Sequence, residues 1–84
     1  MTENQFREAY IEALKSMAGK EEYSWVQGAT IFEIEACVDK MIDSLKENCH
    51  KKWDFLGNNP AMRKAAKKFG VTSSPKLREI AATW

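Results

Sequence analysis

The stretch TIFEIEACVDKMIDSLKENCHKKWDFL, residues 30–56, carries the strongest helical pattern in the chain. Thr30 and Glu33 fit a capping box, in which the hydroxyl accepts from an early backbone N–H and the carboxylate reaches back. The apolar residues that follow recur about every 3.6 residues, the period of an α-helix. They are Ile31, Ile34, Val38, Met41, Leu45, Cys49, Trp53 and Leu56. The pattern predicts one helix that runs unbroken to Gly57.

A helix of this length is long for a chain of 84 residues. Its residues would rise about 39 Å, whereas a compact chain of this size has a diameter of roughly 30 Å. Either the helix bends near Asn48, or its end projects and is covered by another copy of the chain. We expect the projecting helix, with a homodimer contact through it.

The segments before this stretch predict a first helix and a loop. Thr2 and Gln5 fit a second capping box, and Gly19 is placed to end the helix. The apolar face of that helix consists of Phe6, Tyr10, Ala13, Leu14 and Met17. Residues 20–28 then form a loop whose aromatic side chains cover one end of the core.

The segments after it predict two short helices. Asn59 is the N-cap of the first, with Pro60 at the first helical position, where the missing N–H costs nothing. Gly70 ends that helix in the left-handed conformation, and Val71 folds back as in a Schellman motif. Ser74-Pro75 repeats the cap-then-proline signal for the last helix. We therefore expect an all-α fold, a small bundle of about four helices with one long central helix, in a single domain over residues 1–84.

Charge divides this domain into acidic helices (1–56) and a basic helical hairpin (59–84). Residues 1–50 carry five cations and ten anions, a net charge of −5, whereas residues 51–84 carry eight cations and two anions, a net charge of +6. Such asymmetry is typical of a chain that meets a polyanion or an acidic protein surface at one end. The alternative is that the two halves attract each other within the fold.

Residues 62–81 resemble the helix-turn-helix segment of DNA-binding proteins. The resemblance consists of small residues at Ala65 and Ala66, an apolar Phe69, Gly70 in the turn, and then Val71. It implies that the later helix enters the major groove while the earlier helix crosses the phosphate backbone. The basic end of the long helix, CHKKWDFL, would be the helix that precedes the pair.

The resemblance assigns roles to nine residues. Four would open the recognition helix, namely Thr72, Ser73, Ser74 and Lys76, and Arg78 would lie further along it. Four cations would lie near phosphates: Arg63, Lys64, Lys67 and Lys68. Pro75 shifts the helix start, so the turn is longer than is usual, and only Arg78 offers bidentate contact to guanine. We therefore expect low sequence specificity.

Two functions remain open from the sequence. The first is a small nucleic-acid-binding or regulatory protein that contacts DNA through this basic segment. The second is a small helical protein-interaction module, such as a phage- or toxin-type inhibitor, antagonist or adaptor. Its surface would be apolar patches around Trp25, Trp53 and Trp84, or the acidic face of the first two helices. A basic face that is merely solvated explains the same cations without any partner.

The sequence gives no sign of catalysis, so we expect neither an enzyme nor a cofactor. His50 and Cys49 are neighbours on the expected helix and point about 100° apart, which rules out a nucleophile–base pair between them. Cys37, Cys49 and His50 lack the spacing of a zinc site. Reduced thiols favour a cytoplasmic setting. The longest stretch without charge, Tyr23 to Phe32, is far short of the ~20 apolar residues of a membrane span, and MTENQFREAY does not have the pattern of a signal peptide.

Overall fold

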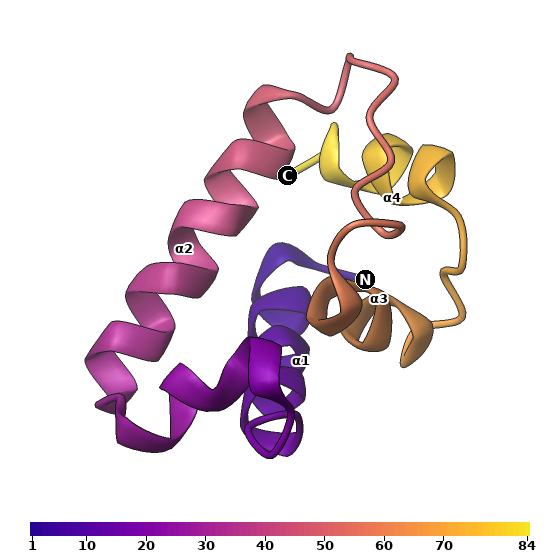
Figure 1. Cartoon of the computed structure of the whole chain (residues 1–84). Helices are drawn as coiled ribbons and strands as arrows, with labels where there is room; N and C mark the ends of the chain where they lie inside the picture. Colours follow the sequence, from indigo (N-terminus) through magenta and orange to yellow (C-terminus); the bar gives the residue numbers. More distant parts are fainter.

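The computed structural model describes residues 1–84, and every regular element in it is helical. The α-helices are α1 (Glu3–Ser16), α2 (Ile31–Glu47), α3 (Pro60–Lys67) and α4 (Ser74–Ala81), and a 3₁₀-helix, η1 (Glu21–Gly28), joins α1 to α2. Figure 1 shows α2 along one side of the molecule, with α1, α3 and α4 facing it. The predicted all-α fold of about four helices is confirmed.

The predicted extent of the long helix to residue 56 is wrong. α2 ends at Glu47, where the Asn48 side-chain amide donates to the Ser44 carbonyl oxygen at 2.8 Å. The chain then turns back past α4, so that Leu56 is buried in the same molecule, with 3% of its surface exposed. An unbroken helix would have carried Leu56 away from every partner in this chain. The homodimer through that helix loses its premise and stays a prediction.

Helix starts follow the predicted capping signals closely. Thr2 and Gln5 form both bonds of a capping box on α1, and Thr30 and Glu33 do the same on α2. The Asn59 side chain accepts from the backbone N–H of Met62 at 3.0 Å, with Pro60 at the first position of α3. These side chains satisfy N–H groups that have no partner within the helix itself.

The N-cap of α4 lies one residue earlier than predicted, at Ser73 instead of Ser74. The N-cap is Ser73, whose hydroxyl accepts from the Lys76 N–H at 3.4 Å, and Ser74 is the first helical residue. The hydroxyl of Ser74 is used elsewhere, on the loop that returns from α2. The prediction failed here because two adjacent serines offer the same local chemistry, and a contact distant in sequence decides between them.

The Schellman motif predicted after α3 is present. Gly70 has a φ of 75°, the left-handed region that L-residues avoid. Its N–H donates to the Lys67 carbonyl oxygen at 3.0 Å, and the Val71 N–H donates to the Ala66 carbonyl oxygen at 3.1 Å. Val71 is buried, so the motif turns the chain back toward the core.

One hydrophobic core draws side chains from every element. The whole predicted face of α1 is buried, as are Ile34, Val38 and Leu45 of α2. Ile42 rather than Met41 is buried at the next turn of α2, and Ile31 is 41% exposed. The tightest helix pair is α1 with α3, where alanines on both helices let the backbones approach. None of the helices combines the length and the apolar character that crossing a bilayer requires.

The segment predicted as a loop over residues 20–28 forms η1. Val26 is buried and Tyr23 is half-buried, whereas Trp25 is 43% exposed. The Tyr23 hydroxyl accepts from the Ala61 N–H at 3.1 Å and so caps the start of α3 from another element. The Asn59 amide donates to the Tyr10 hydroxyl at 2.8 Å. The aromatic side chains of this region therefore fix the start of the basic segment.

Candidate nucleic-acid interface

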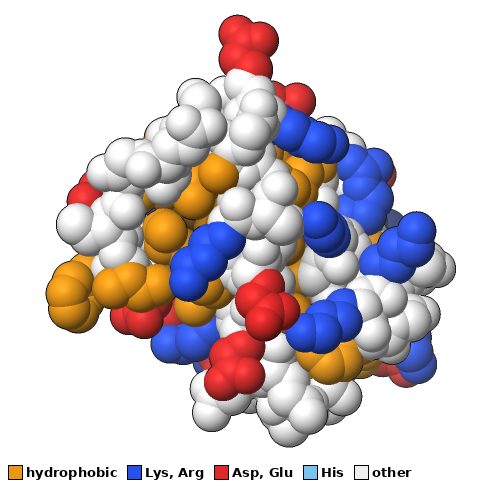
Figure 2. All heavy atoms as spheres, turned by 90° about the horizontal axis from the view of Figure 1, so that it is seen from below, with side chains coloured by type: hydrophobic (Ala, Val, Ile, Leu, Met, Phe, Trp, Pro, Cys, Tyr) orange, Lys and Arg blue, Asp and Glu red, His pale blue; other side chains and the backbone are white.

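The predicted phosphate-contacting residues all lie on the outer surface of α3 and the turn that follows. Arg63, Lys64, Lys67 and Lys68 are exposed, while the opposite face of the helix is buried. Figure 2 views the molecule from below and shows Lys and Arg side chains spread over this end, with fewer Asp and Glu side chains among them. The amphipathic character predicted for α3 is confirmed.

Most of these cations are not engaged by the acidic half of the chain. Among the cations of residues 51–84, Lys68 alone forms an ion pair, with Glu12 of α1 at 3.0 Å. Lys64 donates to the Ser16 hydroxyl at 2.6 Å, which leaves its charge without a counter-charge. The side chains of Lys67 and Lys76 have no hydrogen-bond or ion-pair partner within the chain. An exposed ion pair such as Lys68–Glu12 is worth at most about 1 kcal/mol, so an outside anion can displace it.

The residues assigned to the recognition helix take different positions. Thr72 and Lys76 are exposed, and the hydroxyl of Ser73 is the N-cap acceptor of α4. The guanidinium of Arg78 turns back and donates to the carbonyl oxygen of Trp53. Thr72, Ser73 and Lys76 therefore face outward at the start of α4, whereas Arg78 holds the neighbouring loop.

Helices α3 and α4 depart from the packing that the helix-turn-helix resemblance implies. α3 packs mainly against α1, and α4 packs against α2. Ala65 lies beside Ala9 and Ala13 of α1, so this small residue brings α3 close to α1 rather than to α4. The connection over residues 68–73 is also longer than the 3–4-residue turn typical of the motif. The arrangement therefore does not support insertion of α4 into a groove in the manner of that motif.

A small polar cluster fixes residues 53–57 to the start of α4. The buried hydroxyl of Ser74 accepts from the Leu56 N–H at 3.0 Å and donates to Asp54 Oδ1 at 2.6 Å. The same carboxylate oxygen accepts from the Gly57 N–H at 2.9 Å. The bond from Ser74, together with that from Gly57 and with the nearby charges of Arg63 and Arg78, lowers the pKa of Asp54. Asp54 is therefore an ionised anchor of the loop.

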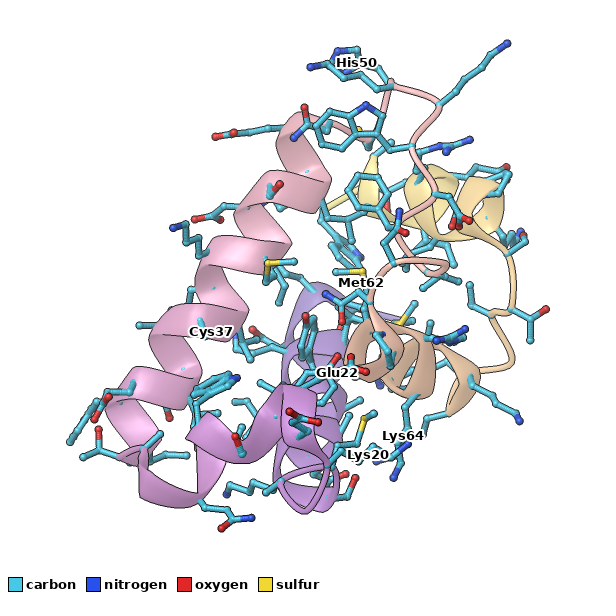
Figure 3. The ribbon with its side chains drawn as sticks, in the orientation of Figure 1. Lys20, Glu22, Cys37, His50, Met62 and Lys64 are labelled. Carbon is cyan, nitrogen blue, oxygen red and sulfur yellow. The ribbon has the colours of Figure 1, made fainter.

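The loop over residues 48–59 presents a groove that sequence analysis missed. Trp53 is 48% exposed, and the groove beside it has a volume of about 540 Å³ between the loop and Met41 and Ser44 of α2. Figure 3 shows Met62, which lines the groove, between α2 and this loop. The sequence KKWDF, two lysines followed by aromatic residues, is the signal that could have indicated this groove. It was assigned to the expected long helix instead.

The apolar patches predicted around the three tryptophans are present at two of them. Trp25 and Trp53 are both exposed, but Trp84 packs on Phe6, with ring centroids 5.4 Å apart, and belongs to the core. Two further large apolar side chains are exposed at the start of α2, where Phe32 is 77% exposed and Ile31 is 41% exposed, and Trp25 precedes them on η1. Figure 2 shows apolar side chains reaching the surface at this edge of the molecule.

The sulfur and imidazole groups lie apart. Figure 3 shows His50 at the tip of the loop and Cys37 near the middle of α2. Both thiols are free and half-buried, and burial raises the pKa of the Cys37 thiol, which keeps it protonated and a poor nucleophile. The chain has no group of three His, Cys, Asp or Glu side chains disposed to hold a metal ion.

Comparison with protein-family models, with curated proteins and with solved structures finds no match for this chain.

Proposed function

We propose that this protein binds nucleic acid through its phosphate backbone, using the exposed cations of α3 and the start of α4. One observation carries the proposal: of the cations in residues 51–84, only Lys68 is paired with a carboxylate of the same chain. Exposed lysines and arginines that neutralise phosphates release condensed counterions, which drives binding without reading sequence. Few base-reading side chains lie on this surface, so the proposed specificity is low and the biological role is that of a small regulatory or accessory protein.

The proposal uses the sequence-predicted residues in modified roles. Arg63, Lys64, Lys67 and Lys76 contact phosphates, and Thr72 lies exposed next to them. Lys68 joins them when the polymer displaces Glu12. Arg78 positions the loop through the Trp53 carbonyl oxygen instead of reading a base. A cytoplasmic setting, where both thiols stay reduced, belongs to the same proposal.

Binding of a fluorescein-labelled DNA duplex, followed by anisotropy at several salt concentrations, tests the proposal. Lys67→Gln and Lys76→Gln each remove one exposed, unpaired cation of the proposed surface. Lys40→Gln is the matched control, because Lys40 is exposed on α2 and the net charge of the variant is the same. Each of the first two variants is expected to reduce the magnitude of the log–log salt slope by about 0.9, whereas the control leaves it unchanged. If all three variants changed the salt slope equally, binding would depend on the net charge of the protein and not on the proposed surface.

A second candidate function is favoured by the apolar surface at the start of α2. Three large apolar side chains lie exposed within residues 25–32, and clusters of this kind are typical of protein-interaction sites. A protein inhibitor or adaptor would use this surface rather than the cations of α3. The test is affinity capture of partners with the wild type, Phe32→Ser and Trp53→Ala. A partner that is lost only with Phe32→Ser supports this function, and equal capture by all three excludes the patch.

A further inference from the structure

We infer that the nucleic acid taken by this surface is single-stranded, and that an unpaired base stacks on Trp53 in the groove between the loop and α2. The inference rests on the proposed function and names its substrate class. Trp53 is 48% exposed although its own carbonyl oxygen and the N–H of Leu56, three residues later, are bonded to Arg78 and Ser74 of α4. The ammonium of Lys51 lies over this ring, so a base that stacks on that face takes the place of the ammonium.

Contacts of its backbone, of the residue that follows and of its ring keep Trp53 in place. Its carbonyl oxygen accepts from the guanidinium of Arg78, and the chain directly after it is fixed by the Asp54 carboxylate on Ser74 and Gly57. The ring also contacts Phe55, with centroids 5.8 Å apart and an angle of 47° between the planes. Ordering a stacking surface before the ligand arrives lowers the entropy lost on binding.

Two hollows adjoin this ring, and lysine lines both. The larger has a volume of about 540 Å³ and the smaller, toward α4, about 260 Å³; Lys52 and Trp53 line each of them. The ammonium of Lys51 lies 5.0 Å from the centroid of the indole. A ring with cations beside it matches the combination that single-stranded nucleic acids require, in which bases stack on aromatic side chains while lysines and arginines follow the phosphates.

The charges around the groove determine the path that a bound nucleic-acid strand takes over the surface. The flank of α2 beyond the groove has a net negative charge and disfavours phosphates: Asp43 and Glu47 line a hollow there, together with Lys40 and with Asp39, which is paired with Arg7. The opposite side leads past Lys52 to the start of α4, where Lys76 is exposed. The ionised Asp54 lines both hollows as well; its Oδ1 accepts from Ser74 and Gly57, and the cations Lys52 and Arg78 on the same walls offset its charge. The backbone therefore runs from the loop toward α4, and a base enters the groove beside Trp53.

A duplex cannot make this contact, because its bases are stacked on one another and their faces are covered. The test therefore compares a labelled oligothymidylate of about 15 nucleotides, near the upper end of known site sizes, with a duplex of equal length. Trp53→Ala is compared with Trp25→Ala, which removes another half-exposed tryptophan, on η1. Urea unfolding and circular dichroism of both variants report whether each retains the fold.

We expect Trp53→Ala to weaken single-strand binding by about 5- to 100-fold, the effect of losing one stacked base, and to change duplex binding by less than about 2-fold. Trp53→Phe is expected to retain most of the single-strand affinity, because a phenyl ring still stacks, and Trp25→Ala to retain all of it. In a Trp25→Phe/Trp84→Phe background, the fluorescence of the remaining Trp53 should be quenched by the oligothymidylate. Equal effects of Trp53→Ala and Trp25→Ala, or an unquenched Trp53, would overturn the inference while leaving backbone binding intact. Absence of binding to either polymer at low salt would overturn the proposed function and this inference together.

Discussion

Replacing Ser74 by alanine tests how the loop that carries Trp53 is held. The Ser74 side chain is the one buried polar side chain in the core region, and its hydroxyl serves two partners at once. Without it, the N–H of Leu56 has no acceptor in a place that water does not reach, since Leu56 itself is 3% exposed. The Asp54 carboxylate loses its hydrogen bond from Ser74 but is exposed and can be solvated instead.

The size of the effect follows from the buried N–H. Leaving a buried donor without a partner costs about 1–3 kcal/mol of the free energy of unfolding. In a domain of this size each kcal/mol lowers the melting temperature by roughly 4–8 °C, so Ser74→Ala should lower it by about 4–24 °C. Urea unfolding followed by far-UV circular dichroism measures the same change as a shift of the midpoint with an unchanged slope.

The pH dependence adds a second readout. Because the folded pKa of Asp54 lies below its ordinary value of 3.8, this carboxylate stabilises the fold above that pH and its contribution is lost as the pH falls through the folded pKa. Ser74 is the main cause of the lowered pKa, so its loss moves the pKa of Asp54 back up. The stability of Ser74→Ala should therefore fall less steeply below pH 4 than that of the wild type.

Two other serines, one adjacent to Ser74 and one distant from it in sequence, serve as controls for this prediction. Ser73→Ala removes only the N-cap of α4 and should lower the free energy of unfolding by about 1 kcal/mol. The loss of stability below pH 4 should remain as steep as in the wild type. Ser24→Ala alters an exposed hydroxyl with no bond in the chain and should be neutral. If Ser74→Ala behaves as Ser24→Ala does, the loop is not held by this cluster and the fixed platform for Trp53 is refuted.

Three further substitutions test the backbone arrangement by thermal unfolding. Gly57→Ala places a Cβ 2.0 Å from Asp54 Oδ2, so the variant must displace the carboxylate and destabilise the loop. Gly19→Ala is the control, because its Cβ meets nothing within 4 Å and the melting temperature should not change. Equal melting temperatures of the two variants would contradict the close approach of Gly57 to Asp54. Tyr23→Phe removes the 3.1 Å acceptor of a buried N–H at the start of α3 and should cost about 1–3 kcal/mol, and an unchanged midpoint would show that this hydroxyl is no cap. Gly70→Ala forces a side chain onto a φ of 75° and should cost about 1–2 kcal/mol; a stabilised variant would refute the left-handed turn.

The sequence predicted those features that local chemistry decides. The capping boxes at Thr2 and Thr30, the Asn59 cap and the Gly70 turn each depend on a few adjacent residues, and all are present. The exposed cations of α3 also follow from a helical wheel alone. Such features could be predicted because the partner atoms lie within one or two turns of the same chain segment.

Features decided by distant contacts could not be predicted in this way. The apolar spacing through Cys49, Trp53 and Leu56 has the period of a helix, yet Leu56 is buried by a loop that folds back on α4. The choice between Ser73 and Ser74 as cap depends on Leu56, far away in sequence. The groove at Trp53 was missed for the same reason, because it forms only when residues 48–59 leave the helix.

The salt dependence of duplex binding by the unmodified protein tests the central claim most directly. If the four unpaired cations of the proposed surface, Arg63, Lys64, Lys67 and Lys76, each neutralise one phosphate, the logarithm of the association constant should fall with the logarithm of salt concentration at a slope of about −3.6. A slope near zero, or no measurable binding at 50 mM salt, would contradict the claim that these side chains meet an anionic polymer.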